Sequence, residues 1–189
     1  MALFSFEGRV PNIDPGAFVA PTATIIGDVT VEAGASVWYN AVLRADFGPV
    51  VVRAGANVQD GSVLHSNLET PTEIGPGATV AHLCVVHSAT IEEEALVANG
   101  CTVLDGARVG ARSLVAAHSL VAAGATIPPG VLAAGSPAVV KRLLEGTPAE
   151  MWVRLNPTVY VELARRHATG AKPTDGAADP GGGGVRSRR

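Results

Sequence analysis

The sequence contains few aromatic residues: they make up 4% of its 189 residues, although 47% of the chain is hydrophobic. This composition argues against a globular core built around large rings and favours a thin core of small aliphatic side chains. With only two cysteines, the chain has no disulfide framework, and we expect a cytoplasmic protein. It shows no signal-peptide pattern and no apolar run long enough to span a bilayer, so no membrane association is expected. The net charge of −3 offers no basic stripe, so nucleic acid is not an expected partner.

What the sequence does contain is a period of six residues. An aliphatic residue occupies every sixth position from Val19 to Leu43, and again without interruption from Ile91 to Ile127. Neither a helix, with its period of 3.6, nor a strand, with its period of two, produces this spacing. A parallel β-helix does, because three six-residue segments form one triangular coil of about 18 residues. The sequence therefore predicts an all-β fold of roughly six coils.

The period also predicts how the chain is divided. The expected segments are an N-terminal lead-in that caps the coils (1–18), a β-helix domain (19–137), a C-terminal helix (147–169) and a disordered tail (170–189). Gly135-Ser136-Pro137 ends the repeat, and residues 44–51 and 67–73 interrupt it as insertions. The tail is rich in glycine, proline and charge, a composition that cannot bury enough apolar surface to fold.

A helix start is visible after the coils. Thr147 stands at the N-cap position, Pro148 at the first helical position and Glu150 three residues after the cap, which is the pattern of a capping box. Apolar residues then recur every four positions, at Met151, Leu155, Val159 and Leu163. We expect this stripe to pack back along the coils.

Three of the five histidines are candidate metal ligands. His65 and His87 each follow an inward-facing aliphatic residue and are one coil apart once the inserted residues are discounted, so they should stack on neighbouring coils. Two imidazoles placed in this way can bind one metal ion. His82 lies five residues before His87, with a coil corner between them, and is therefore out of reach of the pair in the same chain. We expect a neighbouring molecule in a closed ring to supply its own His82, which leaves a fourth metal position open for catalysis.

The motifs around these histidines resemble those of the γ-class carbonic anhydrase family. The matching segments, within residues 10–168, are Gly27-Asp28-Val29, Arg44-Ala45-Asp46, Asn57-Val58-Gln59-Asp60-Gly61, the three histidines and Gly135-Ser136-Pro137. The resemblance implies a left-handed β-helix with a C-terminal helix, and a homotrimer that holds Zn²⁺ between subunits through His65, His82 and His87. Fe²⁺ or Co²⁺ would also suit imidazole ligands. The implied reaction is the hydration of CO₂ to bicarbonate by a metal-bound hydroxide.

The resemblance also implies roles for polar residues near the metal. The implied site residues are Arg44, Asp46, Asn57, Gln59, Asp60 and Tyr160. Arg44 would pair with the two aspartates across the subunit boundary and position the site. Gln59 would orient the metal-bound water. Tyr160 would reach a pocket from the C-terminal helix, with packing in the core as the alternative.

One departure from the family pattern leaves the reaction open. Phe47 follows Asp46, where the prototype enzymes carry a glutamate thought to assist proton transfer. The segment Arg44-Ala45-Asp46-Phe47-Gly48 is most similar to the branch associated with phenylacetate breakdown, so a metal-dependent acyl-CoA thioesterase is one alternative. A hexapeptide acyltransferase, which needs one histidine as general base and no metal, is another. A non-catalytic metal-binding homologue is the third.

Overall fold

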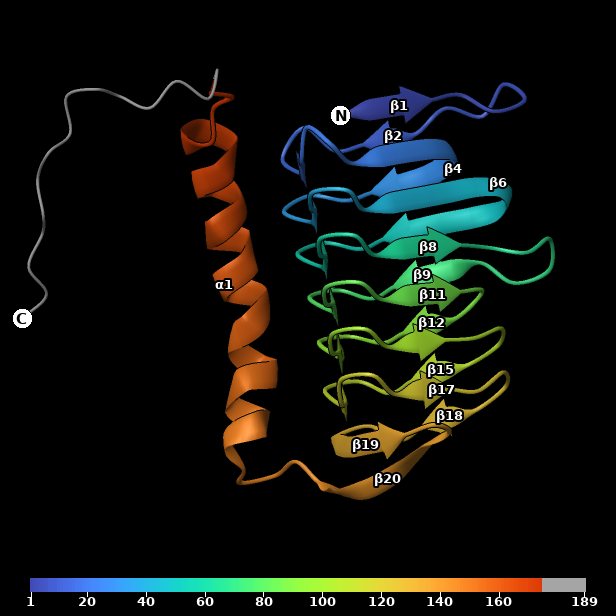
Figure 1. The fold of residues 1–189 in the computed structure, drawn as a ribbon, viewed down its shortest axis with the longest axis vertical. Coiled ribbons are helices and arrows are strands. Elements are labelled where there is room, and N and C mark those ends of the chain that lie inside the picture. The colour runs from blue at the N-terminus through green and yellow to red at the C-terminus, as the bar shows by residue number, and fades with distance from the viewer. Residues whose placement is uncertain (175–189) are drawn as a thin grey trace, which may run out of the picture.

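The chain forms a left-handed parallel β-helix with one α-helix beside it (Figure 1), as the six-residue period and, for the handedness, the family resemblance predict. The computed structural model describes residues 1–174. Most of the predicted tail, residues 175–189, lies outside the described residues. Within residues 1–174, no helix is both long and apolar enough to cross a membrane.

The coils place their strands in two hydrogen-bonded sheets. The first sheet contains β3 (Phe18–Val19), β5 (Ser36–Val37), β7 (Asn57–Val58), β10 (Thr79–Val80), β13 (Leu96–Val97), β16 (Leu114–Val115), β19 (Val131–Gly135) and β20 (Ala138–Leu143). The second, which covers the other sides of the coils, contains β1 (Ala2–Phe4), β2 (Asn12–Ile13), β4 (Thr24–Val31), β6 (Val42–Val52), β8 (Val63–His65), β9 (Thr72–Ile74), β11 (Val85–His87), β12 (Thr90–Ile91), β14 (Thr102–Val103), β15 (Arg108–Val109), β17 (Leu120–Val121) and β18 (Thr126–Ile127).

The number of coils and the role of the first residues differ from the prediction. Among residues 1–174, seven parallel strands are stacked from β3 to β19, against the roughly six coils expected. The additional coil comes from residues 1–18, because β1 and β2 pair in parallel with β4, and β3 pairs with β5. This segment therefore begins the β-helix rather than capping it. The repeat ends at β19, and β20 returns antiparallel to it after Gly135-Ser136-Pro137.

The six-residue period places its aliphatic residues in the core. Strand pairing puts Leu43 opposite Leu64 and Val58 opposite Val80, and all four side chains are fully buried. Because every coil repeats the same register, each inward side chain stacks on its equivalent in the next coil. This constant register lets a polar residue just outside the core stack on a polar residue one coil away.

Both predicted insertions lie at the corner where the second sheet turns from the β8 side to the β9 side, and both are shorter than predicted. Strand β6 runs through residues 44–51, and its pairing with β4 jumps from Ala45 to Val50, so only residues 46–49 bulge outward. The second insertion is the 66–71 loop between β8 and β9. A Cβ atom at Gly48 would collide with the carbonyl oxygen of Asn67, so the bulge packs tightly against this loop.

Helix α1 (Pro148–Gly170) begins at the predicted cap. The Thr147 hydroxyl accepts a hydrogen bond from the backbone N–H of Glu150 at 3.3 Å. The Glu150 carboxylate accepts from the N–H of Gly146 at 2.8 Å, one residue earlier than a standard capping box would place it. The helix runs alongside the stack of coils (Figure 1) and contacts the side formed by β3, β5 and β7.

The predicted packing stripe of α1 is wrong. Met151, Leu155 and Val159 remain 61%, 51% and 46% exposed, and the buried helix residues are Val153, Asn156 and Ala164. Val153 packs with Leu96 and Leu144 in a small cluster of buried residues separate from the main core. A polar contact through Asn156 and an aromatic contact through Tyr160 orient the rest of the helix. These long-range contacts select a helix face that the four-residue spacing does not reveal.

Candidate metal centre and adjoining cavity

His65 and His87 lie at the ends of two neighbouring parallel strands. Strands β8 and β11 pair in register, with His65 directly opposite His87. His65 Nδ1 is 3.0 Å from His87 Nε2, and the ring centroids are 5.0 Å apart. The stacking that the residue count predicts is therefore present in the fold.

Each ring of this pair has a carboxylate on its other nitrogen. Asp46 Oδ1 lies 2.9 Å from His65 Nε2, and Asp105 Oδ1 lies 2.5 Å from His87 Nδ1. Burial alone would raise the pKa of Asp46, but hydrogen bonds from His65 and Arg44 outweigh it and hold that pKa below its usual value. The hydrogen bond from His87 likewise lowers the pKa of Asp105, against a smaller effect of burial. Both carboxylates are therefore ionised acceptors for imidazole N–H groups.

The pair fits one half of a metal site. With both imidazole protons donated to the carboxylates, His65 Nδ1 and His87 Nε2 face each other with lone pairs, an arrangement that requires a cation or a shared proton between them. Two nitrogen ligands of one tetrahedral Zn²⁺ lie about 3.3 Å apart, close to the observed 3.0 Å. A carboxylate on the second nitrogen is the usual support for a ligating histidine. Within residues 1–174, however, no three His, Cys, Asp or Glu side chains are arranged so that they could together hold a metal ion.

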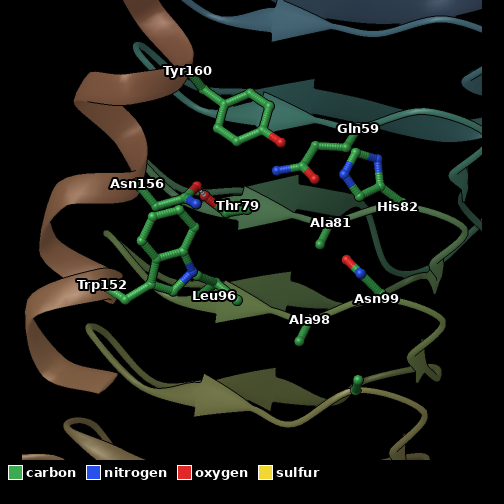
Figure 2. A pocket seen from close by; sticks show the side chains of 11 residues that line it. Gln59, Thr79, Ala81, His82, Leu96, Ala98, Asn99, Trp152, Asn156 and Tyr160 are labelled. Atoms are coloured by element: carbon green, nitrogen blue, oxygen red, sulfur yellow. Dashed lines mark hydrogen bonds between the residues drawn. The ribbon is translucent and has the colours of Figure 1, made fainter. Parts of the chain in front are cut away.

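His82 lies at a different place, in the turn that follows β10. Its Nδ1 is 2.9 Å from Asp60 Oδ2, and its side chain is 42% exposed. The ring stands at the rim of a cavity of about 290 Å³ between the coils and α1 (Figure 2). The structure thus separates His82 from the stacked pair. His82 nevertheless has an aspartate beside one ring nitrogen, as His65 and His87 do.

Gln59 lines this cavity and is held by a chain of buried polar side chains. Gln59 Nε2 donates to Asn57 Oδ1 at 2.9 Å, and Asn57 Nδ2 donates to Thr79 Oγ1 at 2.9 Å. Thr79 Oγ1 in turn donates to Asn156 Oδ1 on α1 at 2.7 Å. All four residues are at most 3% exposed. The chain links the coils to the helix and leaves Gln59 Oε1 available as an acceptor.

Tyr160 fits both of the roles considered for it. Its hydroxyl points toward Gln59 at the cavity wall (Figure 2), while its ring packs edge-on against Trp38 with centroids 5.4 Å apart. Burial raises the pKa of Tyr160, the negative charge of Asp60 raises it further, and a hydrogen bond from Gln59 opposes both. The phenol is therefore a proton donor at neutral pH.

The charged residues of the motifs form pairs within the single chain. Arg44 forms an ion pair with Asp46, whereas Asp60 pairs with His82. The pairing of Arg44 with both aspartates across a subunit boundary stays a prediction, because it involves a second subunit. Asp105 was missed, although it follows His87 by 18 residues and the coil length alone would have placed it beside that ring.

Phe47 lies beside the histidine pair. The ring is 53% exposed, and its centroid lies 5.9 Å from that of His65. The Arg9 guanidinium holds the bulge by donating to the carbonyl oxygens of Asp46 and Phe47. The position next to the pair therefore presents an apolar surface and no proton acceptor.

Comparison with known proteins shows which family the chain resembles. No protein-family model matches the chain. The chain is 42% identical to "Gamma carbonic anhydrase 1, mitochondrial" of Arabidopsis thaliana, over 90% of its own length and 64% of the relative's. It is 43% identical to a carbonic anhydrase of Geobacillus kaustophilus, covering 79% of this chain and 82% of that one. It is also 39% identical to the carnitine operon protein CaiE of Salmonella agona, covering 92% and 87%.

Solved structures agree with this assignment of the fold. A Bacillus cereus protein superposes with a TM-score of 0.86 and 36% identity, over 88% of this chain and 96% of that one. A hexapeptide transferase family protein of Anaplasma phagocytophilum gives 0.81 and 34%, over 87% and 96%. These similarities extend over the coils and most of the chain. The chain therefore belongs to the family of γ-class carbonic anhydrases and their hexapeptide-repeat, left-handed β-helix relatives.

Proposed function

We propose that the protein is a metal-dependent, γ-carbonic anhydrase-like enzyme that hydrates CO₂ to bicarbonate. One observation carries the proposal: His65, His82 and His87 each have one ring nitrogen within 2.9 Å of a carboxylate oxygen of a different aspartate. The other nitrogen of each ring remains available, which is the arrangement of ligating histidines. Three imidazoles leave one position of a tetrahedral metal open for substrate.

The separation of His82 from the pair supports a shared site. We infer a homotrimer in which the pair of one subunit meets His82 of the next, because a closed ring joins two different surfaces at every interface. Zn²⁺ is the metal we propose, with Fe²⁺ or Co²⁺ as alternatives that imidazole also suits. The free thiols of Cys84 and Cys101 favour a reducing compartment, and we infer the cytoplasm.

The residues around the cavity would divide the chemistry among them. A bound metal would supply Lewis acidity that brings the pKa of water close to neutrality. The hydrogen bond from Gln59 Nε2 to Asn57 fixes the orientation of the amide and leaves Gln59 Oε1 free. This oxygen would accept a hydrogen bond from the attacking water and fix its direction. Tyr160 would donate to a substrate oxygen. Phe47 offers no acceptor for the released proton, so proton export would depend on buffer and be slow.

Thioester hydrolysis is the second candidate, favoured by the size of the cavity. About 290 Å³ exceeds the need of CO₂ several times, and Leu96 and Trp152 give the cavity an apolar wall. A short acyl or aryl group of a coenzyme A thioester would fit such a space. The same metal-activated water would then attack a thioester carbonyl.

Metal analysis followed by two assays tests these alternatives. The full chain is purified without oxygen, its metal is quantified, and CO₂ hydration by stopped flow is measured beside hydrolysis of short acyl-CoA thioesters. We expect one metal per subunit and CO₂ hydration that disappears in His65→Ala. Thioester turnover without CO₂ hydration would select the second candidate. Acyl transfer without metal would identify a transferase, and metal without turnover a non-catalytic homologue. A metal-loaded monomer would contradict the shared site.

A further inference from the structure

Asp105 lies in the turn between β14 and β15, one coil beyond His87. We propose that Asp105, held by Asn67, is a positioning residue that keeps the proton of His87 on Nδ1 and so presents Nε2 as the metal donor. This inference rests on the proposed metal site. It assigns a function both to Asp105 and to the 66–71 loop that carries Asn67.

Both carboxylate oxygens of Asp105 are engaged. Oδ1 lies 2.5 Å from His87 Nδ1, and Oδ2 accepts a hydrogen bond from Asn67 Nδ2 at 2.9 Å. The Asp105 carbonyl accepts from the N–H of Gly124 at 2.8 Å, so the turn is also anchored to the following coil. Although the side chain is 46% exposed, it is fixed from two directions.

The local contacts also determine which end of the Asn67 amide faces Asp105. Asn67 Oδ1 accepts from the backbone N–H groups of Glu69 and Thr70 at 2.9 and 2.8 Å. The backbone N–H of Asn67 donates to the Ser88 hydroxyl at 2.7 Å. Since the amide oxygen is occupied by two donors, the amide nitrogen must point outward. The 66–71 loop therefore presents a donor, and only a donor, to Asp105.

His65 is held in the same way, by a carboxylate that also binds a further donor, but the donor is of a different kind. Asp46 contacts His65 through Oδ1 and Arg44 through Oδ2, so a carboxylate bridges each imidazole to a further donor. The donor is a charged guanidinium beside His65 and a neutral amide beside His87. Outer contacts of this kind fix the tautomer and orientation of a ligating ring, and their loss costs 10-fold to 100-fold in metal affinity.

The test compares Asp105→Ala and Asp105→Asn with Glu145→Gln in the full chain. Glu145 is exposed just after β20, at the far end of the coils, so its variant removes the same charge away from the site. Competition titration gives the dissociation constant for Zn²⁺, and ¹⁵N imidazole NMR of the metal-free protein gives the tautomer of His87. We expect Asp105→Ala to bind Zn²⁺ roughly 10-fold to 100-fold more weakly. Asp105→Asn keeps an acceptor and should lose less, and Asn67→Ala should act in the same direction.

The tautomer separates this inference from the proposed function. In the wild-type protein Nδ1 of His87 should carry a proton, and in Asp105→Ala Nδ1 should lose that proton in favour of Nε2. Unchanged affinity together with an unchanged tautomer in Asp105→Ala would overturn the positioning role. If the wild-type protein binds no Zn²⁺ but the tautomer of His87 still differs between wild type and Asp105→Ala, the proposed function is overturned. The role of Asp105 in positioning His87 would then still stand.

Discussion

The His65–His87 pair and the His82 corner have different surroundings. The pair lies on the second sheet, beside the 46–49 bulge and the 66–71 loop, and its surroundings are carboxylates, an arginine and an amide. The His82 corner faces α1 across the cavity, and its surroundings are the Asp60 carboxylate, amides, a phenol and apolar side chains. Under the proposed function, this difference predicts a division of labour. All three histidines would hold the ion, and the residues beside His82 would also orient the substrate.

The largest expected effect comes from breaking each half-site in a different chain. His65→Ala and His82→Ala trimers should each bind no catalytic metal on their own. After unfolding and refolding together at equal amounts, about a quarter of the interfaces should join an intact pair to an intact His82. Metal content and activity should therefore return to about a quarter of the wild-type values. The measurement is metal analysis of the mixed trimers.

A mixture of His65→Ala with His87→Ala is the matched control for that experiment. Both substitutions damage the same half-site, so no interface regains a complete pair, and no recovery is expected. Recovery in this control would show that the two histidines act separately. Absence of recovery in the first mixture, with mixed trimers present, would contradict a site shared between subunits.

The period of six explains why the paired half-site was predictable. In a coil of constant register, residues one turn apart must stack, so counting places His65 against His87, and the same count would have found Asp105. The count fails at Asp46, because the 46–49 bulge disturbs the register there, and only the resemblance suggested that residue.

The helix-covered half-site was less predictable, because its geometry depends on contacts far apart in the sequence. The four-residue spacing that includes Leu155 marks one apolar face of α1, but it does not show which face of the helix packs against the coils. The hydrogen bond between Thr79 and Asn156 joins residues 77 positions apart and selects a different face. The cavity beside His82 exists because of that choice.

Substituting Gln59 should separate orientation of the substrate from metal binding. Gln59→Ala removes the acceptor aimed at the attacking water, and we expect kcat for CO₂ hydration to fall about 100-fold. Metal content should stay at the wild-type value, because no ligand and no ligand-bound aspartate is touched. Asn12→Ala truncates an exposed amide on β2 and is the control. Loss of metal in Gln59→Ala would show that the two half-sites are not functionally distinct.

Loosening α1 should disturb the His82 half-site alone. Val153 is 1% exposed beneath the helix, whereas Leu155 is 51% exposed. Val153→Ala should lower the free energy of unfolding by about 2 kcal/mol, and Leu155→Ala should change it by less than about 0.5 kcal/mol. Urea unfolding measures both. The tautomer of His87 should be unchanged in either variant, and a change there would mean that the helix also supports the pair.

The smallest expected effect lies in a third region, away from both half-sites. Arg53 bridges Glu32 and Glu73 at 2.8 and 2.7 Å, and the hydrogen bond from Arg53 lowers the pKa of Glu32 below its usual 4.5 against the effect of burial. A lowered carboxyl pKa means that the unfolded chain binds the proton more tightly. The stabilisation is therefore complete above pH 4.5 and is lost as the pH falls through the folded-state pKa.

Glu32→Gln should flatten that acid slope by less than about 1 kcal/mol. Urea unfolding from pH 6 to pH 3 measures the slope, and an unchanged slope would contradict the ion pair. Zn²⁺ affinity at neutral pH should be unaltered, because this region reaches neither the histidine pair nor His82.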